Sequence, residues 1–178
     1  MVRMAVVSDA PAIAELHRLG WEAYRGLIDD RLLAETPGKA AARLARWRSQ
    51  LQPGRATRVL VDDHDGVLRG FISSGPCADP DLPGSEGQDA DEIWDLWVHP
   101  DHRRRGVGAA LLTHVLRDSR RPLMVWVLNE NTDGIRFYQR EGARWDGLMR
   151  SEVVEGIELT MLRLVWPSPP AGDGRARD

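Results

Sequence analysis

The sequence predicts an α/β fold in which strands of mixed direction share one sheet with helices between them. β-Prone runs rich in valine, leucine, isoleucine and tryptophan recur along the chain, and stretches with apolar residues at three- and four-residue spacing separate several of them. Parallel neighbours need such helical crossovers, whereas the run over 57–73 carries the signature of an antiparallel hairpin. At 178 residues the chain is long enough for one domain with a substantial core.

The first half of the chain predicts a strand, two helices and a hairpin. Ser8 and Asp9, with Pro11 shortly after, indicate a helix start, because a capping oxygen precedes a residue whose φ is already fixed. Asp65 and Gly66 form a turn signal between two β-prone runs. The expected elements are a strand within 2–7, a helix from about residue 10 that ends or bends at Gly26, a helix over 39–51, and hairpin strands over 57–61 and 67–73.

The second half predicts alternating strands and helices after a loop. From residue 77 to residue 90 the composition changes to proline, glycine, aspartate and serine, which is typical of a loop. We expect a single domain over residues 1–165 and a disordered tail over 166–178, where "PSPPAGDGRARD" has little to bury. The expected elements are strands over 92–98 and 123–128, helices over 108–116 and 132–140, and a final strand pair within 143–164.

Composition and charge narrow the class of protein. The net charge of −3 gives no general attraction to nucleic acid or to an anionic membrane, and no apolar run approaches the length of a membrane span. Cys77 is the only cysteine, so an internal disulfide and a metal cluster of several thiolates are both excluded. The five histidines show no metal-ligand spacing. We therefore expect a cytoplasmic protein without a metal.

The stretch "HPDHRRRGVGAALLTHVL" places three arginines and a Gly-x-Gly pair between a strand and a helix. A helix N-terminus after a glycine-containing turn presents unpaired N–H groups and a partial positive charge, which together can hold a pyrophosphate. Arg103 to Arg105 can add charge-assisted hydrogen bonds, while Gly106 and Gly108 let a ligand approach the backbone. A solvated basic turn, a nucleic-acid patch or simple helix capping would explain the same residues. The Gly-Lys-Ser/Thr of nucleotide hydrolases and the third glycine of dinucleotide-binding proteins are both missing.

Two motifs resemble the GNAT acetyltransferases. "RRRGVG" matches their Arg/Gln-x-x-Gly-x-Gly/Ala signature, and "NENTDGIRFYQREGA" is similar to their Asn-x-x-Ala-x-x-Phe-Tyr-x-x-x-Gly-Phe, with Gly134 and Ala143 as departures. The resemblance extends from about Val2 to Leu164. It implies a mixed central sheet of about six to seven strands flanked by about four helices.

The resemblance also implies acetyl-CoA as the co-substrate. The cofactor would enter between strands 93–98 and 123–128, which splay apart in this family, and asparagine at the start of the second motif binds the pantetheine arm. The residues expected to bind it are Trp97, Val98, Arg103, Arg104, Arg105, Gly106, Val107, Gly108, Ala109, Asn131 and Phe137.

The same resemblance implies direct attack of an amine on the thioester. Glu92 matches a glutamate that acts as general base in several relatives, Tyr138 matches the tyrosine that protonates the departing thiolate, and the amide of Val98 would hold the oxyanion. Asp95 is the other carboxylate considered as the base, although three residues along a regular strand would place it on the opposite side from Glu92. Glu92 could instead be an exposed strand-end residue, and Tyr138 a core aromatic.

The acceptor is expected to be a primary amine with a positive charge. Trp21, Tyr24 and Asp95 are candidates for contacting it, although aromatic residues at helical spacing usually pack inward. Acidic residues and no basic ones occur between Cys77 and Asp95, which would attract a cation. A peptide N-terminus or a lysine is the alternative acceptor, and a non-catalytic acyl-CoA sensor is the alternative function. Dimerisation, which is frequent in the family, stays open.

Overall fold

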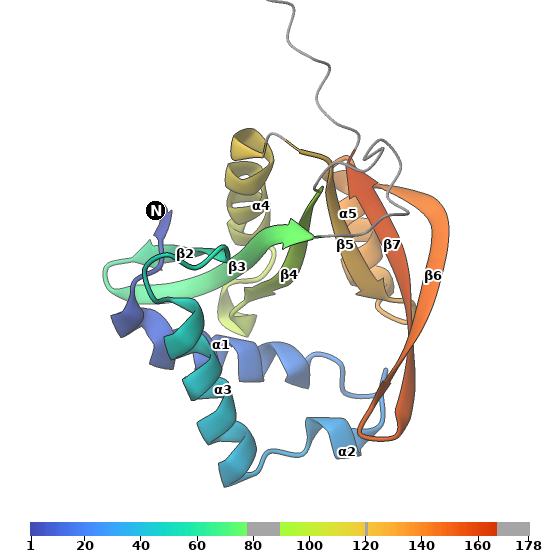
Figure 1. The fold of residues 1–178 in the computed structure, drawn as a ribbon, viewed down its shortest axis with the longest axis horizontal. Coiled ribbons are helices and arrows are strands. Elements are labelled where there is room, and N and C mark those ends of the chain that lie inside the picture. Colours follow the sequence, from blue (N-terminus) through green and yellow to red (C-terminus); the bar gives the residue numbers. More distant parts are fainter. Residues whose placement is uncertain (78–89, 120, 167–178) are drawn as a thin grey trace, which may run out of the picture.

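The computed structural model describes residues 1–77, 90–119 and 121–166. It contains one seven-stranded sheet with the strand order β1-β2-β3-β4-β5-β7-β6 and helices on both faces (Figure 1). The predicted mixed α/β fold is confirmed, because β4 and β5 are parallel while the other neighbouring strands are antiparallel. The elements are β1 (Val2–Met4), α1 (Ala10–Glu22), α2 (Asp30–Leu33), α3 (Pro37–Gln50), β2 (Arg58–His64), β3 (Val67–Cys77), β4 (Ala90–Val98), α4 (Val107–Asp118), β5 (Leu123–Leu128), α5 (Thr132–Arg140), β6 (Arg144–Val154) and β7 (Ile157–Trp166), with short 3₁₀ turns at Val7–Asp9 and Pro100–His102.

Most predicted elements lie close to the observed ones, with three differences. β1 ends at Met4 because the chain turns into a 3₁₀ helix at Val7–Asp9. The short helix α2 was not predicted; the side chain of Asp29 caps it by accepting a hydrogen bond from the backbone of Arg31. Trp166 belongs to β7 rather than to a tail, and the predicted tail over 167–178 lies outside the described residues, as does most of the predicted loop.

Two apolar cores lie on opposite faces of the sheet. One joins α4 and α5 to the strands, with Leu111 and Leu112 fully buried. The other joins α1 and α3 to β2 and β3, with Ile13 and Trp47 almost completely buried. Each such aliphatic side chain contributes about 1.5 to 3 kcal/mol on leaving water, so both helix layers are held firmly to the sheet. No helix within the described ranges is long and apolar enough to cross a membrane.

The sheet opens between its two central strands. β4 and β5 pair only where Asp91, Glu92 and Ile93 lie opposite Leu123, Met124 and Val125. Beyond that point β4 continues beside β3, and β5 continues beside β7. The two strands therefore part toward the turn before α4, and the term cleft below means this gap between their unpaired edges. The predicted splaying of these strands is confirmed.

A β-bulge in β4 changes which residues share a face. Ser73 lies opposite Asp95 and Ser74 lies opposite Ile93, so Trp94 has no partner on β3. As a result Ile93 and Leu96 both pack against the α4 layer, although they are three residues apart. The expectation that Glu92 and Asp95 point to opposite sides assumed a regular strand and is wrong. Both lie on the face that α1 and α3 cover.

Candidate functional site

The turn before α4 has the geometry of an anion-binding site. Gly106 precedes the helix with a φ of +79°, and α4 has no side-chain cap at this end. Its first backbone N–H groups are therefore not satisfied by a side chain. A Cβ built on Gly106 meets nothing within 4 Å, so the turn faces open space. These features fit the diphosphate of a nucleotide-bearing ligand, which needs donors, partial positive charge and room.

The three arginines surround this turn at the surface. Arg103 donates from Nε to the carbonyl oxygen of Val98 at 3.3 Å, which ties the turn to the end of β4. All three side chains are exposed, and none has a carboxylate partner within the described part of the chain. Three unpaired guanidinium groups beside free N–H groups would strengthen the attraction for a phosphate. Arg104 also has a φ of +60°, which is uncommon for a residue with a side chain.

Gly108, Val98 and Phe137 meet at the mouth of the cleft. A Cβ on Gly108 would lie 3.5 Å from the ring of Phe137 and 3.6 Å from Val98. The structure thus brings together the ends of β4, the start of α4 and the middle of α5. Val107 is buried below them and holds the helix against the sheet, while Ala109 is half-buried in the first turn.

Tyr138 lies in the core beside the cleft. Its ring packs edge-on against Trp166 and Phe137, at centroid distances of 5.8 Å and 5.1 Å. Its hydroxyl has no hydrogen-bond partner among the described residues. Burial raises the pKa of this hydroxyl above its ordinary value, and the nearby Tyr24 and Asp95 raise it further. Tyr138 therefore keeps its proton at neutral pH.

Asn131 caps α5 and lies near Tyr24, which follows α1. Its side-chain oxygen accepts a hydrogen bond from the backbone N–H of Gly134 at 2.9 Å. Burial raises the pKa of the Tyr24 hydroxyl to about 12, and the nearby Asn131 opposes this shift. Asn131 and Tyr24, which the sequence assigned to cofactor and acceptor respectively, therefore lie close together.

The two candidate bases differ in their surroundings. Glu92 lies in the paired part of β4, opposite Gly75 and Met124, and its half-buried carboxylate has no hydrogen bond or ion pair to any described residue. Asp95 is only 7% exposed; it accepts a hydrogen bond from Ser73 Oγ at 2.7 Å and pairs with Arg46 at 3.2 Å. Asp95 is thus held in place, and its charge acts on Tyr138.

His17 is at the centre of a polar cluster that the sequence did not reveal. Its Nδ1 lies 3.1 Å from the indole nitrogen of Trp47, and its Nε2 lies 2.9 Å from that of Trp21 and 3.6 Å from Asp95. A neutral imidazole accepts at one nitrogen only. We assign the proton to Nε2, facing Asp95, so that Nδ1 accepts from Trp47. Burial lowers the pKa of His17 to about 4, more than Asp95 raises it.

This cluster contains more hydrogen-bond donors than acceptors. With Nε2 protonated, the indole N–H of Trp21 faces another N–H group. The indole nitrogen of Trp97, which packs between His17 and Tyr24, is buried and has no partner in the described ranges. The site therefore has a buried donor that an oxygen atom of a ligand would satisfy. The four-residue spacing of His17 and Trp21 was visible in the sequence, but the contact with Trp47, on another helix, was not.

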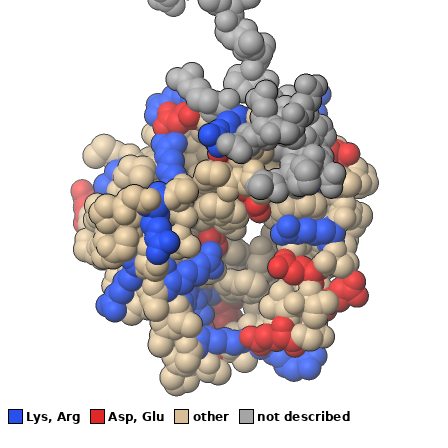
Figure 2. Space-filling model, viewed as in Figure 1, with Lys and Arg blue, Asp and Glu red and all other residues tan. Residues whose placement is uncertain are grey.

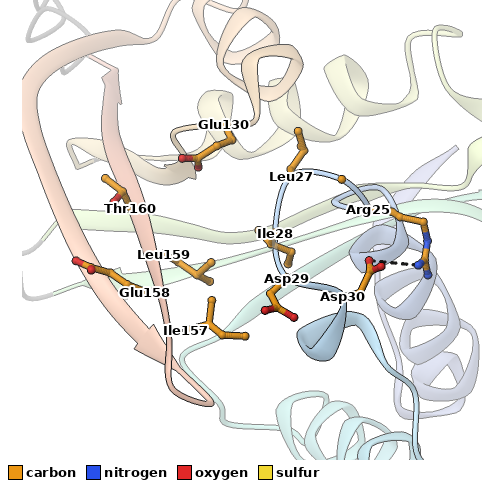
Figure 3. A pocket seen from close by; sticks show the side chains of 11 residues that line it. Arg25, Leu27, Ile28, Asp29, Asp30, Glu130, Ile157, Glu158, Leu159 and Thr160 are labelled. Carbon is orange, nitrogen blue, oxygen red and sulfur yellow. Dashed lines mark hydrogen bonds and ion pairs between the residues drawn. The ribbon is translucent and has the colours of Figure 1, made fainter.

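A pocket of about 570 Å³ lies beyond the end of α1 (Figure 3). The segment after α1, the residue before Asn131, and the start of β7 form its walls. Figure 3 shows Ile157 and Leu159 directed toward Ile28, with Glu130 above them, whereas the side chain of Glu158 points to the other side of β7. The residues that line it are Arg25, Gly26, Leu27, Ile28, Asp29, Asp30, Glu130, Ile157, Glu158, Leu159 and Thr160.

The pocket is acidic. Four carboxylates and one guanidinium group line it. The guanidinium group belongs to Arg25, which is paired with Asp30 at 3.3 Å. Asp29 is paired with Arg31. Glu130 and Glu158 have no ion pair within the ranges that the structure covers. In the space-filling view the surface is hollowed between the α1–α3 side and the β6–β7 hairpin; acidic side chains border the hollow mainly on the β6–β7 side and basic ones on the α1–α3 side (Figure 2). No group of three potential metal ligands occurs among residues 1–77, 90–119 and 121–166.

Comparison with known proteins identifies the family. The model of the acetyltransferase (GNAT) family matches residues 13–143. The chain is 43% identical over 72 residues, 40% of its length, to the mycothiol acetyltransferase of Kineococcus radiotolerans, of which this match spans 22%. The chain thus spans less than a third of the first curated relatives it matches.

Solved structures share the fold. A ribosomal-protein-alanine N-acetyltransferase from Brucella melitensis superposes with a TM-score of 0.67 over 93% of this chain and 98% of that one, at 20% identity. The PaiA N-acetyltransferase from Thermoplasma acidophilum, in complex with coenzyme A, gives a TM-score of 0.65 over 91% and 96%, at 17% identity. Since the family model covers well over half of the sequence, the chain belongs to the acetyltransferase (GNAT) family.

Proposed function

We propose that the protein transfers the acetyl group of acetyl-CoA to a primary amine by direct attack, with both substrates bound at once. The observation that carries this proposal is the parting of β4 and β5 at a cleft that leads to an uncapped, open helix N-terminus with three unpaired arginines. The turn supplies donors for the diphosphate of coenzyme A, and the exposed edges of the two strands supply hydrogen bonds for an extended pantetheine arm. A relative in the same fold was solved with coenzyme A bound.

Acetyl-CoA supplies an acetyl group activated as a thioester. A carboxylate of the chain takes a proton from the acceptor ammonium, so that the amine can form the new C–N bond while the C–S bond breaks. Glu92 is our candidate for this base, because its carboxylate is not engaged by any described group. Asp95 is the second candidate, because its charge reaches both Tyr24 and Tyr138. The backbone N–H of Val98 would stabilise the oxyanion.

Tyr138 would assist the departing sulfur by a hydrogen bond rather than by giving up its proton completely. The pKa of its hydroxyl is raised by burial, whereas an ordinary thiol has a pKa of about 8.5. Complete transfer from such a phenol to a thiolate is therefore unfavourable. A hydrogen bond to the developing thiolate still lowers its energy, and the solvent then supplies the proton.

The acceptor would be a small molecule that carries a positive charge in addition to the reacting amine. Glu130, without an ion pair in the described structure, offers a carboxylate to a cationic group, and the aliphatic side chains of Ile28 and Leu159 suit a hydrocarbon spacer. The relatives named above carry different acceptors in their names, one mycothiol and one a ribosomal protein, so the acceptor rests on the pocket alone.

Release of the coenzyme A thiol with a panel of amines tests the proposal. Diamines, polyamines and aminoglycosides should give higher kcat/KM than monoamines of matched length, and neutral hydroxyl compounds should give no turnover. Tight binding of acetyl-CoA without thiol release for any amine would point to the sensor instead. Equal rates with cationic and uncharged amines would overturn the assignment of the acceptor while leaving the transfer reaction.

A further inference from the structure

The two edges of the sheet differ in how well they are protected from pairing with another molecule. β1, at one edge, is three residues long, whereas β6, at the other edge, has eleven. Figure 1 shows β6 as the outer strand, with β7 beside it. A short edge strand offers few free backbone groups, but a long one can accept a strand of another molecule. Proline and lysine commonly prevent this at exposed edges, and β6 contains neither.

β6 also exposes large apolar side chains that the helices do not cover. Met149 is 47% exposed and Val153 is 70% exposed. Leu162, which lies opposite Met149 on β7, is only 9% exposed, so the covering layer ends between these two strands. Because Met149 and Val153 are four residues apart on a strand, they lie on the same face. A second strand added at this edge would cover both of them.

The turn between β6 and β7 determines which backbone groups of β6 are free. Val154 and Ile157 pair across a two-residue turn, and both turn residues have a positive φ, at 50° and 80°. A turn of this kind closes on a hydrogen-bonded pair. Hydrogen bonding alternates along an antiparallel strand, so the backbone groups of Met149, Ser151 and Val153 point away from β7.

The charges of β6 select one register for two copies of this strand paired antiparallel. With the two-fold axis at Ser151, Arg150 of each copy lies opposite Glu152 of the other, and Met149 lies opposite Val153. An axis shifted by one residue would place Arg150 against Arg150, or Glu152 against Glu152. A shift by two residues leaves no opposite charges facing each other. The strand is therefore complementary to itself in one register.

Both charged side chains are available for this pairing. Arg150 and Glu152 are about half exposed, and within one chain their closest atoms, Nη2 and Oε2, are 3.9 Å apart. The guanidinium group of Arg150 lies 4.4 Å from the ring centroid of Trp126, which holds it against the sheet. A carboxylate from a neighbouring strand would meet this group at the distance of a directly opposite pair.

We propose that β6 is an interface for a second copy of this chain, in which the two β6 strands pair antiparallel about Ser151 and join the two sheets. The outward backbone groups supply hydrogen bonds, Met149 and Val153 cover each other, and the two charged residues fix the register. The paired segment is short, so the dimer dissociates on dilution. The proposal does not depend on the reaction that the protein catalyses.

Exchange of charges between variants tests the pairing. Sedimentation velocity across a range of concentrations should show a monomer–dimer equilibrium for the original protein. Arg150→Glu and Glu152→Arg should each raise the dissociation constant of the dimer by about tenfold or more, because like charges then face each other twice. An equal mixture of the two variants should dimerise again, since each charge then faces its opposite. Arg117→Glu, which makes the same change of charge at an exposed position of α4, should dimerise like the original protein.

A disulfide at the axis tests the register. Ser151→Cys places two thiols on residues whose Cα atoms are about 5.5 Å apart, which a disulfide can span. Val153→Cys is the matched control on the same face, because its two copies would be about 13 Å apart along the strands. After mild oxidation, a non-reducing gel should show a linked dimer for Ser151→Cys only. The original protein, whose single thiol is Cys77, gives the background.

Four results would overturn the proposal. The first is an original protein that stays monomeric at every concentration. The second is a dimer that Arg150→Glu does not weaken, which would place the contact on another surface. The third is a mixture of the two charge variants that does not recover, and recovery would at the same time show that both variants are folded. The fourth is linkage of Val153→Cys without linkage of Ser151→Cys, which would exclude the axis at Ser151.

Discussion

The turn before α4 and the polar cluster around His17 are built in opposite ways. The turn uses backbone N–H groups and arginines within seven consecutive residues, Arg103 to Ala109. The cluster uses side chains from α1, α3 and β4, namely His17, Trp47 and Asp95, which meet only in the folded chain. A binding site made of local backbone can be read from sequence, whereas a site made of distant side chains cannot.

The same contrast suggests that the turn and the side-chain cluster bind different substrates. A ligand common to a whole family suits a site of backbone groups, because the backbone does not change when side chains do. The acceptor, which differs between relatives, suits a binding site made of side chains, because these can be replaced one at a time. Changes in the turn should therefore alter cofactor affinity, and changes on the α1 side should alter turnover or acceptor binding.

Among the substitutions that test this comparison, Glu92→Gln should change the measured activity most. Loss of the general base should lower kcat by about 10² to 10⁴ while acetyl-CoA affinity stays the same, because Glu92 lies on the face opposite the α4 layer. Rate measurements with the best acceptor would check the fall in kcat, and calorimetric titration would check the affinity for acetyl-CoA. Asp95→Asn is the comparison variant; if it abolishes turnover while Glu92→Gln keeps full activity, Asp95 is the base.

The sequence predicted the parts of the fold that depend on neighbouring residues. β5 and α5 lie where the pattern placed them, over Leu123–Leu128 and Thr132–Arg140, because a continuous apolar run and a capping asparagine define them locally. The bulge at Trp94 was not predictable, since it depends on how β4 fits against β3. It is nevertheless the feature that brings Glu92 and Asp95 to one face.

The candidate site divides in the same way. The glycine-arginine turn and the positions of Val98, Phe137 and Tyr138 around the cleft followed from motifs. His17 did not, because nothing near it in the sequence indicates that Trp47 and Asp95 surround it. The glycine at position 134, where the family motif has alanine, was visible in the sequence, but its close approach to the side chain of Asn131 was not.

His17 should make the stability of the α1 side depend on pH. Because burial lowers its pKa from 6.5 to about 4 in the folded protein, the neutral form is favoured there, and the unfolded chain binds more protons between these values. The contribution is complete above about pH 6.5 and is lost as the pH falls toward 4, by at most about 3 kcal/mol. The charged groups that act on it are Asp95, Arg46 and Arg43.

Denaturant unfolding at pH 7 and pH 4.5 would measure this dependence. His17→Gln should lose less free energy of unfolding than the original protein over that interval, although it is less stable at pH 7. An identical pH dependence in the variant and the original protein would mean that His17 is not buried in its neutral form.

Gly106→Ala should give the smallest of these effects and the most specific one. Its φ of +79° is costly for any residue with a Cβ, by about 1 to 2 kcal/mol, even though the Cβ itself would meet no atom. Gly54→Ala is a matched control, because Gly54 has a φ of +83° and equally open surroundings in a turn after α3. Both variants should lose similar free energy of unfolding, but only Gly106→Ala should bind acetyl-CoA more weakly, by up to about tenfold, as the turn relaxes away from its left-handed conformation. Equal affinities in the two variants would show that the backbone of this turn does not hold the cofactor. The contrast between a cofactor site of backbone groups and an acceptor site of side chains would then be wrong for the cofactor.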